Sequence, residues 1–200
     1  MTNAHEVQRF FSDYGDTTVR LNYDLNENSI VFDLGFYMGD FTEKIINKYD
    51  CFVYGYEPIQ KYYDLSLHKF QNNPKIKIFN YGLGNCTETV KIVDSADSSS
   101  IYQEVFDDFT VINIVDISDE ISNLKIKKID LMKINIEGSE YTLLDRMIKS
   151  GIIGIVDNLQ IQFHVEHETE ITRDYIQSHL KNTHNLTYNY TYVWENWKLN

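Results

Sequence analysis

From residue 29 onward, short apolar runs alternate with longer segments whose apolar residues recur at helical spacing. The first run, Ser-Ile-Val-Phe-Asp-Leu at residues 29–34, lies between a turn and Gly35. Short apolar runs bounded by turn residues are typical of buried strands. Strands that alternate with helices predict an α/β fold with a parallel sheet. The predicted strands are residues 29–34, 51–56, 75–81, 129–136 and 156–165, and the predicted helices are 41–49, 58–70, 139–149 and about 168–182.

The remaining segments complete a single domain, residues 1–200, with its core from residue 29 on. Residues 4–14 carry spaced apolar side chains and predict a short helix, and an extended segment leads from it to residue 28. About 45 residues without a clear crossover helix separate the third and fourth strands; residues 87–93 and 109–115 predict an inserted β-hairpin there. The tail, residues 186–197, predicts two more strands.

Composition and charge exclude several classes of protein. Of the 200 residues, 42% are hydrophobic and 14% aromatic, which excludes a disordered chain. A net charge of −12 opposes binding to a phosphate backbone or an anionic membrane, so we expect no nucleic-acid partner. With no long apolar run and no secretory signal, we expect no membrane insertion and a cytoplasmic location. Cys51 and Cys86 lack the spacing of a zinc site.

The segment from Asp33 to Gly39 forms the predicted loop between the first strand and the first helix. Gly35 and Gly39 permit a tight turn and a close approach of a ligand to the helix N-terminus. The spacing D-x-G-x-x-x-G differs from the G-x-G-x-x-G of dinucleotide sites. An acid at the start of the loop favours a ligand with a positive group near Asp33, and a sulfonium with an α-amino group fits this better than NAD. The alternative is that both glycines only turn the chain.

Glu57 ends the second predicted strand, and Pro58 follows it at a position that suits the start of a helix. An acid at this place accepts hydrogen bonds from ribose hydroxyls. The glycine loop and Glu57 together predict a site for an adenosine-bearing cofactor. The alternative for Glu57 is a solvated helix cap.

Polar side chains alternate with apolar ones along the fourth and fifth predicted strands. Lys133, Asn135 and Glu137 share one face of the fourth strand, and His164 belongs to a similar row on the fifth. Buried polar groups cost free energy unless they are satisfied, so the two rows predict a polar network that leads to a site at the carboxyl ends of the strands. A buried Lys133 needs a charge partner, such as Asp33. The alternative is a sheet edge with one solvated face.

Five segments together resemble the FkbM-type methyltransferases, which are S-adenosylmethionine-dependent enzymes of the class I fold. The most specific is Lys-Ile-Asn-Ile-Glu-Gly-Ser-Glu, within residues 131–141; the others are residues 33–42, 55–59, 80–85 and 160–164, and the resemblance extends from about residue 5 to the end. It implies a Rossmann-like, mostly parallel seven-stranded sheet with helices on both faces and the inserted hairpin between strands three and four. It also implies O-methylation, frequently of sugars in surface glycans or of secondary metabolites.

The chain departs from the commoner form of the family, which has Asp at the position of Asn135 and often Glu at that of Gln162. An amide cannot take a proton, so Asn135 is no candidate for a general base. The cofactor site expected from the pattern and the resemblance comprises Asp33, Gly35, Gly39, Glu57, Pro58, Leu83, Ser100 and Asn135. Within it, Leu83 is expected beside the adenine. The resemblance places Ser100 in the cofactor cleft, whereas the sequence by itself favours a plain polar loop there.

His164 is the expected general base, because it ends a strand and an imidazole can be neutral near pH 7. Its alternative is a structural histidine bonded to a backbone carbonyl. Glu137 is expected to orient His164, to hold the substrate or to contact the amino group of the cofactor; its alternative is an interaction with the next helix N-terminus. No metal is expected, because His164 and His167 face opposite ways on an extended strand.

The function expected from these observations is S-adenosylmethionine-dependent O-methylation of a sugar hydroxyl on a glycan, oligosaccharide or nucleotide sugar. The alternatives are an N- or O-methyltransferase of a non-sugar metabolite and a non-catalytic nucleoside-binding module. The loop spacing disfavours a nicotinamide-dependent oxidoreductase. The expected partner is a small-molecule or oligosaccharide acceptor, and the chain is also considered as one domain of a larger glycan-modifying protein.

Overall fold

A computed structural model describes residues 4–92, 109–165 and 170–200. The helices are α1 (Ala4–Ser12), α2 (Asp40–Tyr49), α3 (Gln60–Phe70), α4 (Ile117–Leu124), α5 (Glu140–Ser150) and α6 (Arg173–Leu180), with short 3-10 turns η1 (Val19–Leu21) and η2 (Ile152–Ile155). The strands are β1 (Ile30–Leu34), β2 (Phe52–Tyr56), β3 (Ile76–Phe79), β4 (Gly82–Gly84), β5 (Glu88–Ile92), β6 (Thr110–Asp116), β7 (Leu131–Ile134), β8 (Asn158–Ile161), β9 (His184–Tyr190) and β10 (Trp194–Leu199).

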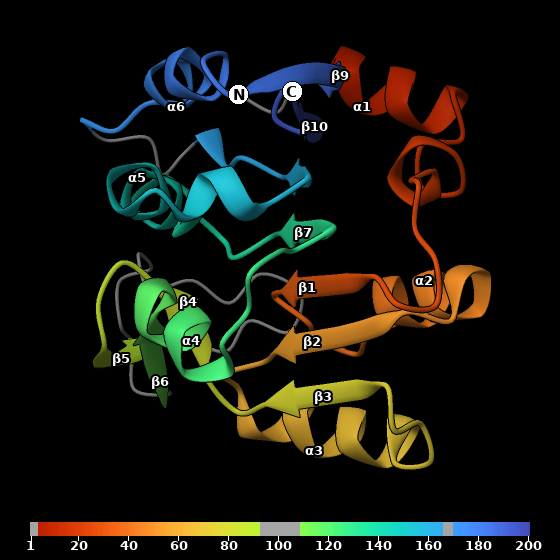
Figure 1. The fold of residues 1–200 in the computed structure, drawn as a ribbon, viewed down its shortest axis with the longest axis vertical. Coiled ribbons are helices and arrows are strands. Elements are labelled where there is room, and N and C mark those ends of the chain that lie inside the picture. The colour runs from red at the N-terminus through yellow and green to blue at the C-terminus, as the bar shows by residue number, and fades with distance from the viewer. Residues whose placement is uncertain (1–3, 93–108, 166–169) are drawn as a thin grey trace.

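Seven of these strands form the main sheet, in the order β3-β2-β1-β7-β8-β10-β9 (Figure 1). The first five pair in parallel, whereas β10 pairs antiparallel with both β8 and β9. Figure 1 shows β1, β2, β3 and β7 pointing the same way, so their carboxyl ends meet at one edge. The predicted mostly parallel seven-stranded sheet is confirmed.

Helices cover both faces of this sheet, because alternate residues of a strand point to opposite sides. Phe32 of β1 and Met132 of β7 belong to the large core cluster that also includes residues of α4, α5 and α6. Their neighbours Val31 and Leu131 belong to a second cluster, with Ile45 of α2 on the other face. No helix in the described part of the chain has the length and apolar character that crossing a bilayer requires.

The N-terminal segment packs over the polar row of β8. Gln160 lies opposite Lys133 in the strand register, and its side chain donates to the carbonyl oxygen of Arg20 and to the hydroxyl of Tyr23. All four residues of β8 are buried between β7 and β10. The alternative of a solvated sheet edge is therefore wrong. The segment after α1 is also not wholly extended, since Val19–Leu21 form the turn η1.

A second, smaller sheet has the order β4-β6-β5 and contains the inserted antiparallel pair β5 and β6, as predicted. The expectation that no crossover helix lies between the third and fourth strands of the main sheet is wrong, because α4 occupies this stretch. Asp116 caps α4 by accepting a hydrogen bond from the backbone N–H of Ser118 (2.7 Å). Ile117 and Ile121, one helical turn apart, then bury against the core.

Candidate functional site

A cavity of about 300 Å³ opens at the carboxyl ends of β1, β2 and β7. Gly35 follows β1, Glu57 follows β2 and Asn135 follows β7, and all three line the cavity. The small sheet contributes a further wall, including Leu83 of β4 and Ile92 of β5. Open α/β sheets bind their ligands outside the carboxyl ends of parallel strands, so this cavity is the candidate functional site.

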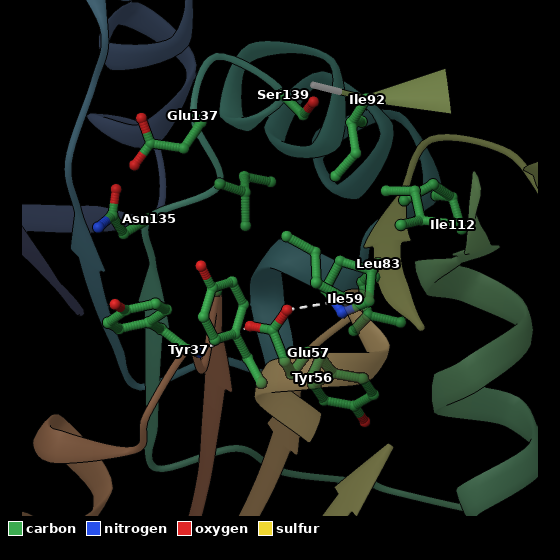
Figure 2. Close-up of a pocket in the computed structure, with 16 residues that line it drawn as sticks. Tyr37, Tyr56, Glu57, Ile59, Leu83, Ile92, Ile112, Asn135, Glu137 and Ser139 are labelled. Atoms are coloured by element: carbon green, nitrogen blue, oxygen red, sulfur yellow. Dashed lines mark hydrogen bonds between the residues drawn. The ribbon is translucent and has the colours of Figure 1, made fainter. Parts of the chain in front are cut away.

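The lining divides into an apolar part and a polar part (Figure 2). Leu83, Ile92 and Ile112 gather on one side of the close-up, whereas Asn135 and Glu137 lie on the other. Glu57, Tyr37 and Ile59 are drawn between and below them. An elongated ligand with an apolar ring at one end and polar groups at the other suits this division.

The loop after β1 approaches the end of β7 so closely that residue 35 must be glycine. The φ angle of Gly35 is +76°, and a Cβ atom there would lie 1.8 Å from the carbonyl oxygen of Asn135. Lys133 fixes the loop from below, because its ammonium donates to the carbonyl oxygens of Gly35 (2.7 Å) and Leu34 (3.1 Å). The loop after β1 and the segment after β7 thus form one wall of the cavity together.

Gly39 is not among the residues that line the cavity. It precedes α2 with a φ angle of +71°, and a Cβ atom there would meet the rings of Phe36 and Phe70. Gly39 therefore shapes the loop and the start of α2.

Asp33 lies below the loop and is fully buried. Its Oδ1 atom lies 3.0 Å from the ammonium of Lys133, which confirms the predicted pairing, and its Oδ2 atom accepts a hydrogen bond from Thr42 (2.8 Å). Burial lowers the pKa of Lys133, whereas the carboxylate of Asp33 acts in the opposite direction. Asp33 does not line the cavity. The positive group beside it in this structure is the ammonium of Lys133. The role of Asp33 in cofactor binding stays a prediction. Asp33 would affect the cofactor through the position of the loop after β1.

Glu57 forms part of the lining although it is only 4% exposed. One carboxylate oxygen accepts from the backbone N–H of Tyr37 (2.7 Å) and the other from that of Ile59 (2.8 Å), which joins the loops after β1 and β2. Burial raises the pKa of Glu57 to about 7, against the effect of these two hydrogen bonds. A carboxylate has about four acceptor positions, so the two backbone donors leave capacity for a ligand. Pro58, predicted at the helix start, precedes α3 by two residues and also lines the cavity.

Glu137 and His164 come together at the polar end of the cavity. Glu137 lines the cavity, whereas His164 lies behind it, with Nε2 3.3 Å from Oε2 of Glu137. The other ring nitrogen, Nδ1, lies 2.9 Å from Oε1 of Glu140. The ring of His164 is therefore placed between two carboxyl groups. The residue at the start of α5 is Glu140, not Glu137.

The family model described as the methyltransferase FkbM domain matches residues 33–190. The chain belongs to the FkbM methyltransferase family. The match includes every cofactor and catalytic residue predicted above. No sequence among curated proteins matches the chain.

Solved structures share the class I methyltransferase fold of this FkbM domain. The 23S rRNA methyltransferase ErmE has a TM-score of 0.53 at 11% identity, over 94% of this chain and 68% of that chain. An rRNA methylase from Streptococcus thermophilus has a TM-score of 0.53 at 10% identity, over 93% of each chain. The Methanococcus jannaschii fibrillarin pre-rRNA processing protein has a TM-score of 0.56 at 10% identity, over 92% and 73%. Identities this low establish the fold alone.

Methyltransferases of this fold generally use S-adenosylmethionine, and the cavity of this FkbM domain fits that group. The apolar part suits an adenine ring, and Glu57 lies where a ribose would present two hydroxyl donors. In the polar part, the buried Oδ1 atom of Asn135 has no hydrogen-bond partner among the described residues. A donor on a bound ligand would satisfy this atom, whose burial without a partner costs free energy.

Several residues of the FkbM site were not predicted from the sequence. Ile92 and Ile112 come from the inserted pair β5 and β6, and only the closure of the small sheet over the cavity brings them there. Tyr37, inside the predicted loop, adopts a φ angle of +50° and lines the cavity. Glu140 had a usable signal, because an acid in the first turn of the predicted helix 139–149 is expected to interact with nearby backbone N–H groups.

Two predicted features fall on residues that the structure leaves out. Ser100, expected in the cofactor cleft, and His167, considered as a metal ligand, lie outside the described residues. Within the described ranges, no group of three or more His, Cys, Asp or Glu side chains is arranged to hold a metal ion. The absence of a metal requirement stays a prediction.

Proposed function

We propose that this FkbM domain is an S-adenosylmethionine-dependent O-methyltransferase whose acceptor is a sugar hydroxyl of a glycan, an oligosaccharide or a nucleotide sugar. One observation carries the cofactor part of this proposal. Glu57 lies in a single cavity at the carboxyl ends of the parallel strands, between an apolar wall and a polar wall. This arrangement matches a nucleoside with a polar, charged extension.

The chain's own residues divide the work of cofactor binding. The apolar wall around Leu83 excludes water from one end of the cavity and packs against the base. Glu57 accepts hydrogen bonds from the ribose hydroxyls with the acceptor positions that Tyr37 and Ile59 leave open. Asn135 Oδ1 accepts from a donor on the amino-acid part.

When bound, S-adenosylmethionine supplies an electrophilic methyl group on a positively charged sulfur. An acceptor hydroxyl that attacks this methyl group must lose its proton, and Glu137 is the ionisable side chain at the polar end of the cavity. His164 lies directly behind Glu137 and can share the proton. General-base assistance of this kind contributes roughly 10²–10⁴-fold to a rate.

A sugar acceptor is supported by the resemblance to enzymes that frequently methylate sugars and by the polar lining at Asn135 and Glu137. The three similar structures reported above are named as RNA methyltransferases or as a pre-rRNA processing protein, so RNA belongs in the same test. A net charge of −12 opposes an RNA acceptor, because a phosphate backbone is attracted by clustered Lys and Arg.

The test has two stages. Calorimetric titration with S-adenosylmethionine, S-adenosylhomocysteine and NAD should show micromolar binding of the first two and none of NAD. Glu57→Ala should abolish that binding, whereas Glu27→Ala, which removes an exposed acid in the turn before β1, should leave it unchanged. If neither S-adenosylmethionine nor S-adenosylhomocysteine binds, the proposal is refuted.

The second stage follows transfer of a labelled methyl group to nucleotide sugars, oligosaccharides, small amines and RNA. Transfer to a sugar hydroxyl supports the proposed acceptor, and transfer to an amine or to RNA overturns it while the cofactor assignment stands. His164→Ala should still bind the cofactor and should lose turnover. Cofactor binding without transfer to any of these acceptors would favour the nucleoside-binding module.

A further inference from the structure

Glu140 is a fully buried acid that contacts His164 and Gly138, the residue after Glu137. Its Oε1 atom accepts from the backbone N–H of His164 (2.7 Å) and lies 2.9 Å from the ring Nδ1 of the same residue. Its Oε2 atom accepts from the backbone N–H of Gly138 (2.9 Å). One side chain therefore ties the segment after β8, three residues beyond Ile161, to the turn that carries Glu137.

We propose that Glu140 is a positioning residue that holds His164 with a proton on Nδ1 and directs Nε2 toward Glu137. The catalytic meaning of this inference rests on the proposed function, whereas its structural content does not. Glu140 lies outside the cavity lining, so the proposed role rests on its contacts with His164 and Gly138 and not on contact with a ligand.

The protonation pattern of Glu140 follows from its backbone contacts. Each of its two oxygens meets a backbone N–H donor, so the carboxyl group acts as an acceptor on both sides. An acceptor on Oε1 requires a donor on Nδ1, and a neutral imidazole has only one N–H. The proton of the neutral ring is therefore held on Nδ1, and Nε2 keeps a lone pair. A buried carboxylate is stabilised by such donors, which replace the water it has lost.

The carboxyl group of Glu140 also stabilises the backbone turn that orients the side chain of Glu137. Glu137 has a φ angle of +52°, which is unusual for a residue with a side chain, and Gly138 follows at +103°. The hydrogen bond from Gly138 to Glu140 stabilises this turn. Because Nε2 of His164 lies 3.3 Å from Oε2 of Glu137, the two atoms form one proton-accepting position beside the cavity.

In the proposed reaction, this position receives the proton of the acceptor. The acceptor O–H bond breaks, its electron pair forms the new bond from oxygen to the methyl carbon, and the electron pair of the broken carbon–sulfur bond stays on sulfur. The proton passes to Glu137 and can move on to Nε2 of His164. If the proton of the neutral ring lay on Nε2 instead, Nε2 would donate to Glu137 and could not take the proton onward from it.

Nitrogen-15 NMR of the ring nitrogens tests the positioning role without an acceptor. The chain has six histidines, and comparison with His164→Gln identifies the signals of His164. Over a titration from about pH 6 to about pH 10, Nδ1 should stay protonated, and any loss of a ring proton should occur at Nε2. A His164 ring whose Nδ1 is the nitrogen that lacks the proton would overturn the proposal, and the protein measured in the titration is the wild type.

Glu140→Leu supplies the second arm. A leucine has no side-chain acceptor, so it cannot hold a proton on Nδ1, and the proton of His164 should redistribute toward Nε2. Tyr141→Phe is the matched control, because it removes a hydrogen bond from the Tyr141 hydroxyl to the backbone oxygen of His164 (3.0 Å) and leaves the ring contact with Glu140. It should leave the protonation pattern unchanged. A folded Glu140→Leu protein with the wild-type pattern would contradict the proposal.

Turnover with an acceptor from the panel above separates this proposal from the proposed function. Glu140→Leu should lower kcat roughly tenfold or more and leave the KM for S-adenosylmethionine unchanged, because Glu140 lies outside the cavity lining. Equal losses in cofactor affinity and kcat would indicate a merely structural role. Failure of all acceptors would remove the proposed function, and the NMR result would still decide whether Glu140 sets the state of His164.

Discussion

Glu57 should make the stability of this domain fall as the pH rises toward neutrality. Burial raises its pKa to about 7 from an ordinary value of 4.5, although the backbone N–H groups of Ile59 and Tyr37 act in the opposite direction. The folded protein therefore binds this proton more tightly than the unfolded chain does. The resulting stabilisation is fully present below about pH 4.5 and is lost as the pH rises through about 7.

The size of the effect follows from the two pKa values. A pKa difference between 4.5 and about 7, at about 1.4 kcal/mol for each pH unit, corresponds to about 3 kcal/mol of unfolding free energy. Glu57→Gln removes the titrating group. It also replaces one carboxylate oxygen, which accepts from a backbone N–H group, by an NH₂ group, and this changes stability by an amount that does not depend on pH. The pH dependence therefore isolates the carboxyl group.

Urea unfolding at several values between about pH 4.5 and about pH 8 measures this difference. The unfolding free energy of the wild type minus that of Glu57→Gln should fall by about 3 kcal/mol across the range. The exposed acid Glu27 provides a control, because Glu27→Gln should give a nearly flat difference. A difference for Glu57→Gln that is constant, or that increases with pH, would refute the assignment of Glu57 as a buried acid with a raised pKa.

Three further predictions concern the same end of the sheet. Calorimetry should show S-adenosylmethionine binding roughly tenfold more tightly at about pH 8 than at about pH 6, because the ionised Glu57 accepts from both ribose hydroxyls, and Glu57→Gln should lose this dependence. Gly35→Ala should cost at least about 2 kcal/mol in urea unfolding, since its Cβ would collide with the carbonyl oxygen of Asn135 at a positive φ angle. Lys133→Met should cost about 3–5 kcal/mol, because it leaves Asp33 as a buried charge without its cation; a smaller loss would mean that Thr42 alone suffices.

The order of the main elements was predictable because each strand and helix shows its own local periodicity. Strands such as β1 and β2 are short apolar runs between turns, and the parallel arrangement follows from the helices between them. The helix α4 was missed although its signals are local, with the cap Asp116 and apolar residues one turn apart at Ile117 and Ile121. The stretch of about 45 residues between the third and fourth predicted strands was interpreted as a hairpin insertion alone.

The apolar wall of the cavity could not be predicted in the same way. Ile92 is an apolar residue of the edge strand β5 and Ile112 one of the central strand β6, and many apolar strand residues in a chain only pack against their neighbours. Their function depends on how β5 and β6 fold back over the ends of β1 and β2, which is a tertiary contact without a local signature. Leu83 was predicted only through the family resemblance, for the same reason.

The polar rows on β7 and β8 show how one sequence signal can have two physical causes. Both rows consist of buried polar residues, and a buried polar group must find a partner wherever it lies. Lys133 finds its partners in Asp33 and in the carbonyl of Gly35, so this half of the network shapes the cavity. Gln160, directly opposite in the register, bonds instead to the N-terminal segment at Arg20. The alternation of polar and apolar residues along a buried strand predicts that the polar side chains have partners. The identity of each partner depends on which segment of the chain covers that part of the sheet.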